Sequence, residues 1–186
     1  MDSQFADRGN MAADEQKKTY TILVVDDEED LREIILSQLE LLEMDRPVVL
    51  ESAENGAEAL KKCGQKWYDA VLSDINMPVM TGLQFLGELR SQGKDTPVVF
   101  LTAFGDKLKA VEALRMGAFD FLDKPWKSDQ LRQTMMAAAT LGAQLCDVEE
   151  ELDRIVSQYT DLSDERRKQI RNVHRSLLLI KTSRVA

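Results

Sequence analysis

Five polar side chains that together suit phosphoryl chemistry follow four short apolar segments of this chain. Asp26 and Asp27 follow TILVV, Asp74 follows DAVLS, Thr102 closes PVVFLT, and Lys124 comes shortly after FDFL. If these segments are strands of one parallel sheet, their carboxyl ends meet at the edge where open α/β sheets bind ligands. Three carboxylates, a hydroxyl and an ammonium group would then share a small space.

Such a group of side chains predicts a metal ion and a phosphoryl acceptor. Carboxylates held close together raise one another's pKa unless a cation joins them, and a hard divalent ion such as Mg²⁺ suits oxygen ligands. One carboxylate can then attack phosphorus, while Lys124 offsets charge on the transferred oxygens. Thr102 offers a hydroxyl to a phosphoryl oxygen, and the small Ala103 beside it leaves the pocket open.

Strand-like and helical segments alternate from Thr21 onward. The strand-like segments are four to six residues long and almost wholly apolar, which is typical of a parallel sheet covered on both faces. The segments between them have helical patterns, over 30–42, 55–66, 82–91, 107–116 and onward from Ser128. This alternation predicts an α/β fold, a doubly wound (βα)5 parallel sheet over about Thr21 to Leu145.

The positions of glycine and proline and the spacing of apolar residues support these elements. Gly117 follows Met116 where a left-handed helix cap would lie, and Pro97 opens the fourth strand without costing a ladder hydrogen bond. Helical spacing predicts that the first helix has one apolar face, which packs on the sheet. Its members are Leu31, Ile34, Ile35, Gln38, Leu39 and Leu42.

The C-terminal stretch departs from the alternation. A heptad seam continues out of the fifth helix through Leu141, Leu145, Val148, Leu152, Ile155, Tyr159 and Leu162. A second helix is predicted after Leu162, with Ser163 as its N-cap. Acidic residues dominate 147–162 and basic residues dominate from Ser163 onward. Residues 146–186 are therefore predicted to form a coiled-coil or αα-hairpin extension that dimerises or carries the output.

Composition bounds the remaining possibilities. The 186 residues are 44% hydrophobic and 31% charged, with a formal net charge of −9, which favours a soluble globular protein and disfavours nonspecific attraction to nucleic acid or anionic lipid. The N-terminal residues 1–18 are polar and are expected to form a flexible tail. With no apolar run of membrane-spanning length, a cytoplasmic protein is expected. Cys63 and Cys146 are expected to be reduced thiols.

Four stretches of the chain resemble the receiver domain of bacterial two-component response regulators, which has the flavodoxin-like fold of chemotaxis regulators. They are ILVVDDEED, VLSDINMPVMTG, VVFLTAF and FDFLDKP, and the resemblance covers about Ile22 to Leu145. It implies a receiver domain at 19–145 that takes a phosphoryl group from a sensor histidine kinase or a phosphotransfer protein. It also implies that the chain is not an enzyme beyond catalysing its own phosphorylation and dephosphorylation.

The resemblance assigns a role to each matching position. It implies that Asp74 is the phosphoacceptor and that Lys124 contacts the phosphoryl group. Mg²⁺ would be held by Asp26, Asp27, Asp74 and the main-chain carbonyl of Asn76.

The resemblance also implies how phosphorylation is sensed. Thr102 would be the switch hydroxyl, and Phe121 the aromatic side chain whose rotamer follows it. The Lys124–Pro125 peptide is expected to be cis. Phe121 has no hydroxyl, so its part of the switch would depend on packing alone. Phe104 is expected near the mouth of the site, and our hypothesis is that it slows the entry of hydrolytic water.

Other functions fit the residues less well. A haloacid-dehalogenase-like phosphatase also uses an aspartyl nucleophile, but its Asp-x-Asp motif is replaced here by DDEED and no cap domain is found. His174, the single histidine, is interpreted as a helix-surface residue rather than a relay donor. DNA binding is disfavoured because the roughly 40 residues after Leu145 could hold only a small helix-turn-helix, and their heptad seam favours a coiled coil instead. They contain a single basic cluster, Arg166 to Arg175. The sequence therefore predicts a phosphorylation-controlled receiver and a homodimer formed through the C-terminal helices, with a possible downstream protein partner.

Overall fold

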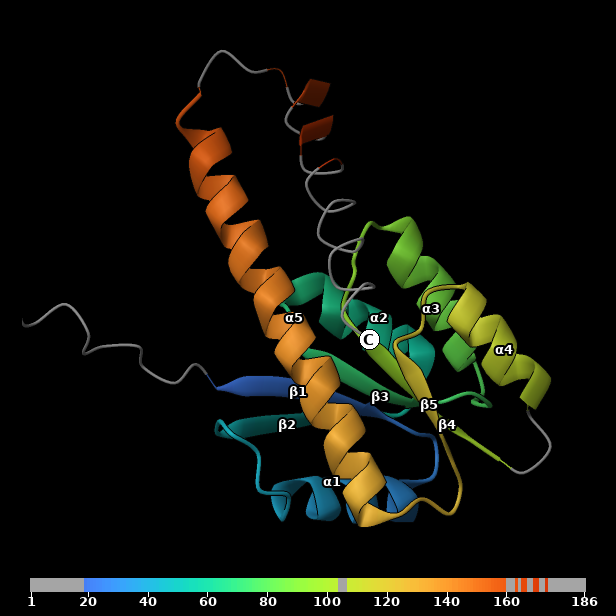
Figure 1. The fold of residues 1–186 in the computed structure, drawn as a ribbon. Coiled ribbons are helices and arrows are strands. Elements are labelled where there is room, and N and C mark those ends of the chain that lie inside the picture. Colours follow the sequence, from blue (N-terminus) through green and yellow to red (C-terminus); the bar gives the residue numbers. More distant parts are fainter. Residues whose placement is uncertain are drawn as a thin grey trace, which may run out of the picture.

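The computed structural model describes residues 19–103, 107–159, 163, 165–166, 169–170 and 173. The predicted N-terminal tail, Phe104, Leu162 and His174 lie outside the described residues, as does most of the predicted second C-terminal helix. Strands and helices alternate through the rest of the chain (Figure 1).

The five strands are β1 (Tyr20–Val25), β2 (Val48–Ala53), β3 (Ala70–Asp74), β4 (Val98–Thr102) and β5 (Asp120–Asp123). The five helices are α1 (Glu29–Glu40), α2 (Gly56–Gln65), α3 (Gly82–Ser91), α4 (Lys107–Arg115) and α5 (Ser128–Ser157). Each predicted element is present, and most predicted ends lie within two residues of the observed ones.

All strand pairs are parallel, in the order β2-β1-β3-β4-β5. The chain moves from β1 to one side for β2 and then to the other side for β3, so the strand order reverses at β1. This is the topological switch point of a doubly wound sheet, beside which ligands bind. The predicted flavodoxin-like (βα)5 fold is confirmed.

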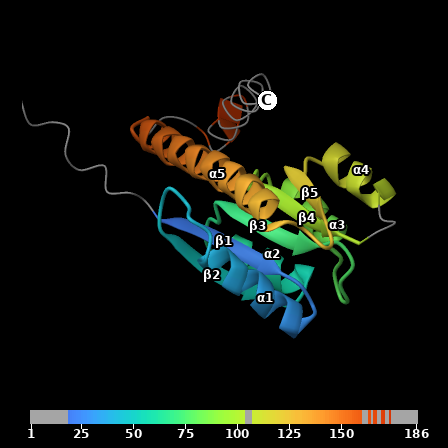
Figure 2. The same cartoon turned by 60° about the horizontal axis from the view of Figure 1, so that its bottom comes forward.

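Alternating strand residues build a core on each face of the sheet. In β1, Ile22 and Val24 join one buried cluster, while Leu23 and Val25 join the other. The helices follow the same division. Side chains of α1 and α5 complete the first cluster, and those of α2, α3 and α4 complete the second. These two sets of helices cover opposite faces of the sheet (Figure 2). Burial on both faces explains why the strand segments are apolar throughout.

Helix α1 buries a narrower face than its apolar stripe predicts. Ile35 and Leu39 are buried, but Ile34 is 52% exposed, so its predicted contact with the sheet is wrong. A straight helix presents only part of a wide stripe to one flat surface. Gln38 is the polar member of this stripe, and its Oε1 accepts a 2.8 Å hydrogen bond from Trp126 Nε1.

Two helices begin at side-chain caps, as their sequences favour. Asn55 Oδ1 accepts hydrogen bonds from the main-chain amides of Ala57 and Glu58 at the start of α2. Thr81 and Gln84 form a capping box at the start of α3. Gly117 has φ 87°, which confirms the left-handed cap predicted after α4.

Helix α5 contains 30 residues and passes the predicted domain boundary at residue 145 without interruption. Its first half packs on the sheet through Leu131, Met135, Ala138 and Ala139. Along the predicted seam, Leu145 is 5% exposed, whereas Ile155 and Tyr159 are 45% and 60% exposed. Pairing through this seam stays a prediction. Within the described residues, no helix combines the length and apolarity needed to cross a bilayer.

One residue near the carboxyl edge of the sheet has an unfavourable backbone conformation. Val79, between β3 and α3, has φ 67° and is 84% exposed. A left-handed conformation costs an ordinary L-residue roughly 1–2 kcal/mol, and asparagine tolerates it better. Val79→Asn should therefore raise the free energy of unfolding by about 1 kcal/mol, measured by urea denaturation.

Val49→Asn is a suitable control for this substitution. Val49 is 48% exposed on the extended strand β2, where asparagine is disfavoured, so this variant should lose stability. An unchanged or lower urea midpoint for Val79→Asn would contradict strain at residue 79.

Candidate functional site

The predicted site residues lie at the carboxyl edge of the sheet, around the switch point. Asp26 directly follows β1, Asp74 and Thr102 are the last residues of β3 and β4, and Lys124 directly follows β5. Parallel pairing of β1 with β3 and of β4 with β3 and β5 brings these strand ends together. Side chains from distant parts of the sequence therefore meet there.

Lys124 joins two of the carboxylates. Its Nζ lies 2.5 Å from Asp74 Oδ1 and 3.4 Å from Asp26 Oδ2. Asp26 and Asp74 are 1% and 7% exposed. Burial alone lowers the pKa of Lys124, but the hydrogen bond to Asp74 and the charges of both carboxylates outweigh it and raise that pKa. The lysine is therefore held as a cation between two acids.

Asp26 is fixed by the start of the connection to α1. Its Oδ1 accepts a 2.9 Å hydrogen bond from the Glu28 amide, and its main-chain oxygen accepts one from Arg32 Nη1 at 2.8 Å. Burial raises the pKa of the Asp26 carboxyl, and the nearby charge of Asp74 adds to this rise. The Glu28 amide and Lys124 only partly offset it. A further positive charge beside Asp26 would thus be favourable.

Asp74 is fixed by main-chain groups of the β3–α3 connection. Its Oδ2 accepts a 2.5 Å hydrogen bond from the Asn76 amide. Gly82 lies against the carbonyl of Asp74, where a Cβ on residue 82 would lie only 2.3 Å from that oxygen. Sequence reasoning missed this role of Gly82, because the close approach joins the start of a helix to the end of a strand.

Asp27 is exposed and lies directly after Asp26. Among the residues that the structure describes, no set of three or more His, Cys, Asp or Glu side chains is gathered as a ready metal site. The donors nevertheless fit a hard divalent cation, because two buried carboxylates face each other and burial has raised the pKa of Asp26. The conflict is relieved in this state by the ammonium group of Lys124.

The hydroxyl of Thr102 faces β5. Thr102 Oγ1 donates to Asp123 Oδ1 at 2.9 Å, and Leu122 O lies 3.4 Å away. Phe121 is half-buried and packs against the second core cluster. The Lys124–Pro125 peptide is cis, as expected. Sequence reasoning missed Asp123, whose role depends on the register that places it opposite Thr102.

A second lysine reaches the site from α4. Lys109 Nζ donates a 2.5 Å hydrogen bond to Asn76 Oδ1, so α4 is tied to the residue whose amide binds Asp74. Nothing in the local sequence of α4 signals this contact, because it joins residues of two different loop-and-helix segments.

The bond between Thr102 and Asp123 leads to a prediction for the resting state. Asp123→Ala removes the acceptor and should free the Thr102 hydroxyl to turn toward Asp74. The variant should therefore bind beryllofluoride, a mimic of a phosphoryl group, about fivefold more tightly, since one net hydrogen bond of about 1 kcal/mol no longer opposes the turn. Magnesium-dependent changes in Trp126 fluorescence can measure this affinity.

Asp123→Asn is the matched control, because its Oδ1 still accepts from Thr102 while the charge is lost. It should bind beryllofluoride with an affinity between those of the unmodified protein and Asp123→Ala, because a neutral amide oxygen accepts more weakly than a carboxylate. Equal affinity of Asp123→Ala and the unmodified protein would show that the Thr102–Asp123 bond does not hold the hydroxyl.

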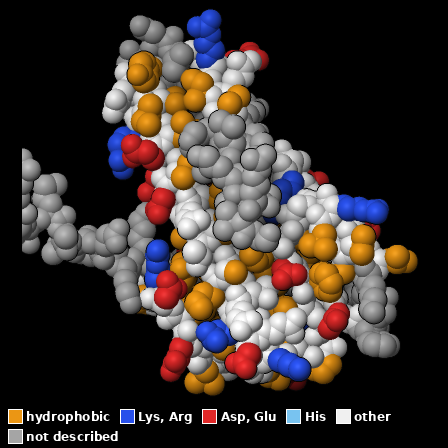
Figure 3. Space-filling model, in the orientation of Figure 1, with side chains coloured by type: hydrophobic (Ala, Val, Ile, Leu, Met, Phe, Trp, Pro, Cys, Tyr) orange, Lys and Arg blue, Asp and Glu red, His pale blue; other side chains and the backbone are white. Residues whose placement is uncertain are grey.

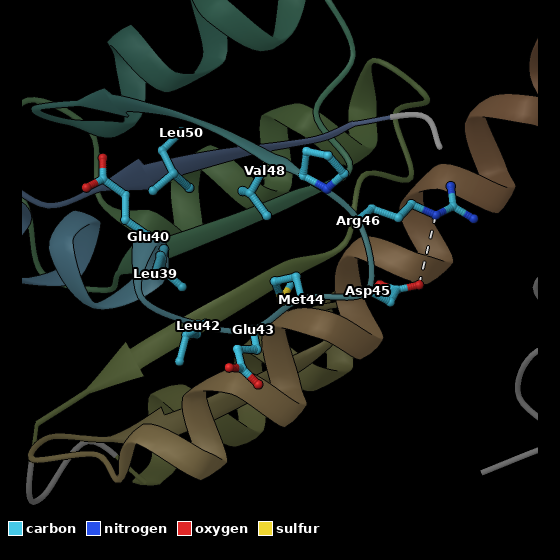
Figure 4. A pocket seen from close by; sticks show the side chains of 10 residues that line it. Leu39, Glu40, Leu42, Glu43, Met44, Asp45, Arg46, Val48 and Leu50 are labelled. Atoms are coloured by element: carbon cyan, nitrogen blue, oxygen red, sulfur yellow. Dashed lines mark ion pairs between the residues drawn. The ribbon is translucent and has the colours of Figure 1, made fainter. Parts of the chain in front are cut away.

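A hollow of the described surface lies elsewhere. A pocket of about 500 Å³ beside the α1–β2 connection has an apolar floor that includes Leu39, Met44 and Val48, with the Arg46–Asp45 ion pair of 4.0 Å at one side (Figure 4). It includes none of the site residues predicted from the sequence.

Comparisons with known proteins agree on the family. The family model described as response regulator receiver domain matches residues 22–136. Regulatory protein AtoC of Escherichia coli (strain K12) is 39% identical over 120 residues, which are 64% of this chain and 25% of AtoC. Transcriptional regulatory protein TdiR of Thauera aromatica is 31% identical over 153 residues, which are 82% of this chain and 66% of TdiR.

Solved structures give the same result. A response regulator receiver domain protein from Clostridium thermocellum has a TM-score of 0.61 and 28% identity, over 68% of this chain and 98% of that one. The chain spans only a quarter to about two thirds of the two curated relatives. Because the family model covers more than half of the chain and every candidate site residue, this chain belongs to the response regulator receiver domain family.

Proposed function

We propose that this chain is a response regulator that accepts a phosphoryl group on Asp74 from a sensor histidine kinase or a phosphotransfer protein. The observation that carries the proposal is the group formed by Asp26, Asp74 and Lys124, in which one ammonium group contacts both buried carboxylates at the switch point of the sheet. Family membership supports the same function. We place this activity in the cytoplasm.

In the proposed reaction, a carboxylate oxygen of Asp74 attacks phosphorus. A bond forms between this oxygen and phosphorus while the phosphorus–nitrogen bond of the donor histidine breaks and its electron pair returns to the imidazole. Asp26, Asp27, Asp74 and the main-chain carbonyl of Asn76 would hold Mg²⁺, which offsets negative charge on the phosphoryl oxygens. Lys124 stays close enough to Asp74 to bind one of those oxygens.

The proposed switch begins at Thr102. Its hydroxyl leaves Asp123 and donates to a phosphoryl oxygen on Asp74, and Phe121 then moves into the space that opens. These two movements reshape the surface made by α4, β5 and α5. Exposed apolar side chains of α4, Leu108, Val111 and Leu114, gather on this side of the molecule (Figure 3).

The proposed output is the helical extension that continues from α5. Ile155 and Tyr159 are exposed large apolar side chains on its outer part, which suits pairing with a second copy of the chain or with a downstream protein. Light scattering with and without beryllofluoride tests this output. An unchanged mass and shape would leave the coupling between phosphorylation and assembly without support.

A second output is kept open by one relative. TdiR is named a transcriptional regulatory protein, and this chain covers 66% of it. A mobility shift with duplex DNA at two salt concentrations separates the outputs, because DNA binding through basic residues weakens steeply as salt rises. A salt-dependent shift would favour DNA binding over a purely helical protein output.

Labelling from acetyl phosphate tests the phosphoacceptor. The unmodified chain should take up label with Mg²⁺ and lose most of it when EDTA is present from the start. Asp74→Asn should take up none, whereas Asp129→Asn, an exposed acid in the first turn of α5, should label normally. Label on Asp74→Asn would refute the assignment. Sustained turnover of small phosphoesters would favour a phosphatase instead.

A further inference from the structure

We propose that Lys109 is a second phosphoryl-binding cation, which positions α4 according to the state of Asp74. This inference rests on the proposed function, since it concerns the phosphorylated form of the same site. In the resting state Lys109 Nζ donates to the side-chain oxygen of Asn76 at 2.5 Å. After phosphorylation the ammonium group exchanges this neutral acceptor for a phosphoryl oxygen.

Two hydrogen bonds connect Lys109 to Asp74 through Asn76. Asn76 uses its amide to bind Asp74 Oδ2 at 2.5 Å and its side chain to bind Lys109 at 2.5 Å. The ammonium group is therefore one residue away from the carboxylate that receives the phosphoryl group. A lysine side chain has a flexible four-carbon stem and three donors, so a change of partner needs only rotations within that stem.

The negative charge of the phosphoryl group favours the movement of Lys109 from Asn76 to that group. A phosphoryl group carries a charge of about −1.5 to −2 and three strong acceptor oxygens. Lys124 is already shared between Asp26 and Asp74. Asp26, Asp27 and the phosphorylated Asp74 would together carry a charge of about −3.5 to −4, which exceeds the three positive charges of Mg²⁺ and Lys124. Hydrogen bonds to a charged oxygen are roughly twice as strong as those to a neutral amide. A phosphoryl oxygen is therefore a stronger acceptor for Lys109 than the amide oxygen of Asn76.

The packing of α4 allows the helix to shift when Lys109 changes its partner. Helix α3 buries the large side chains Phe85, Leu86 and Leu89, whereas the buried ones among the described side chains of α4 are the small Ala110 and Ala113. Since the stabilisation from burial grows with apolar area, α4 is held to the sheet more weakly than α3. Elements with little buried apolar area are the ones that shift most readily.

The consequence is a direct path from the phosphoryl group to the exposed face of α4. Lys109 lies one residue from Leu108 and two from Val111, which are 86% and 46% exposed. A pull on Lys109 toward the site would move these apolar side chains with the helix backbone. In this proposal the α4 surface senses Asp74 through its own lysine, in addition to any signal through Thr102.

Lys109→Gln is the informative variant. Glutamine can still donate to Asn76, so the resting contact is kept while the charge is lost. With Mg²⁺ present, Lys109→Gln should bind beryllofluoride about fivefold to tenfold more weakly than the unmodified chain. Lys109→Arg should recover most of the affinity, because its charge is retained. Lys61→Gln removes an equally positive, exposed side chain from α2 and should have no effect.

Two readouts separate this role from a merely structural one. Raising KCl should weaken beryllofluoride binding more in the unmodified chain than in Lys109→Gln, since salt screens the contribution of the lysine charge. The amide NMR signals of Ala110 and Ala113 should move on beryllofluoride binding in the unmodified chain and move less in Lys109→Gln.

The outcomes distinguish this inference from the proposed function. If the unmodified chain fails to take label on Asp74, the proposed function and this inference both fall. If it labels normally but Lys109→Gln matches it in affinity, salt dependence and amide shifts, only the inference is overturned, and the Lys109–Asn76 contact is a surface hydrogen bond.

Discussion

Lys124→Gln is expected to slow labelling of Asp74 by acetyl phosphate about 100-fold, the usual cost of removing one group that stabilises charge in a transition state. The ammonium group lies 2.5 Å from Asp74 Oδ1, so it is placed to bind an oxygen of the incoming phosphoryl group. Glutamine has a similar polar end but no charge. Initial rates at saturating Mg²⁺ measure the loss.

The same variant should bind Mg²⁺ more tightly than the unmodified chain. Lys124 Nζ contacts both Asp26 and Asp74, so in the resting state it competes with a metal ion for their charge. Slower labelling together with tighter Mg²⁺ binding identifies the effect as electrostatic, because an unfolded variant would neither label nor bind Mg²⁺. Lys61→Gln serves as the control for charge loss elsewhere. Labelling of Lys124→Gln at the unmodified rate would remove Lys124 from the reaction.

Gly142→Ala is expected to lower the free energy of unfolding by about 3 kcal/mol, at the upper end of the usual cost of overpacking. A Cβ on residue 142 would lie 1.8 Å from the main-chain oxygen of Asp69 and 2.6 Å from its carbonyl carbon. Main-chain atoms at the start of β3 cannot move aside as the end of a flexible side chain can. Urea denaturation followed by circular dichroism measures the change.

Gly64→Ala is the matched control. Gly64 lies in α2, and a Cβ there would meet no atom within 4 Å. This substitution should stabilise the chain by about 0.5–1 kcal/mol, since alanine favours a helix over glycine. If Gly142→Ala and Gly64→Ala unfolded at the same urea concentration, the close packing of α5 on Asp69 would be contradicted.

The strands and helices could be predicted because their signals are local. Apolar runs such as TILVV report burial on both faces of the sheet, and caps such as Asn55 and Gly117 report helix ends. The error at Ile34 has a different origin. An apolar stripe tells which residues tolerate burial, but the angle between helix and sheet decides which of them are buried.

The carboxylates and the lysine of the site could also be predicted, because parallel strands bring their carboxyl ends to one edge. Asp123 and Lys109 could not. Their partners, Thr102 and Asn76, are chosen by strand register and by the reach of a side chain from another element. Gly82 and Gly142 were missed because a close approach of two main chains leaves no mark in the spacing of either segment.

The unbroken course of α5 sets the scale of any mechanical response. With a rise of about 1.5 Å per residue, the stretch from Gly142 to Ser157 is about 22 Å long and projects away from the sheet (Figure 1). A rotation of about 10° at Gly142 would displace its tip by roughly 4 Å. Apolar atoms stop touching over such a distance. A tilt of this size at the sheet would therefore be enough to make or break apolar contacts at the end of the helix.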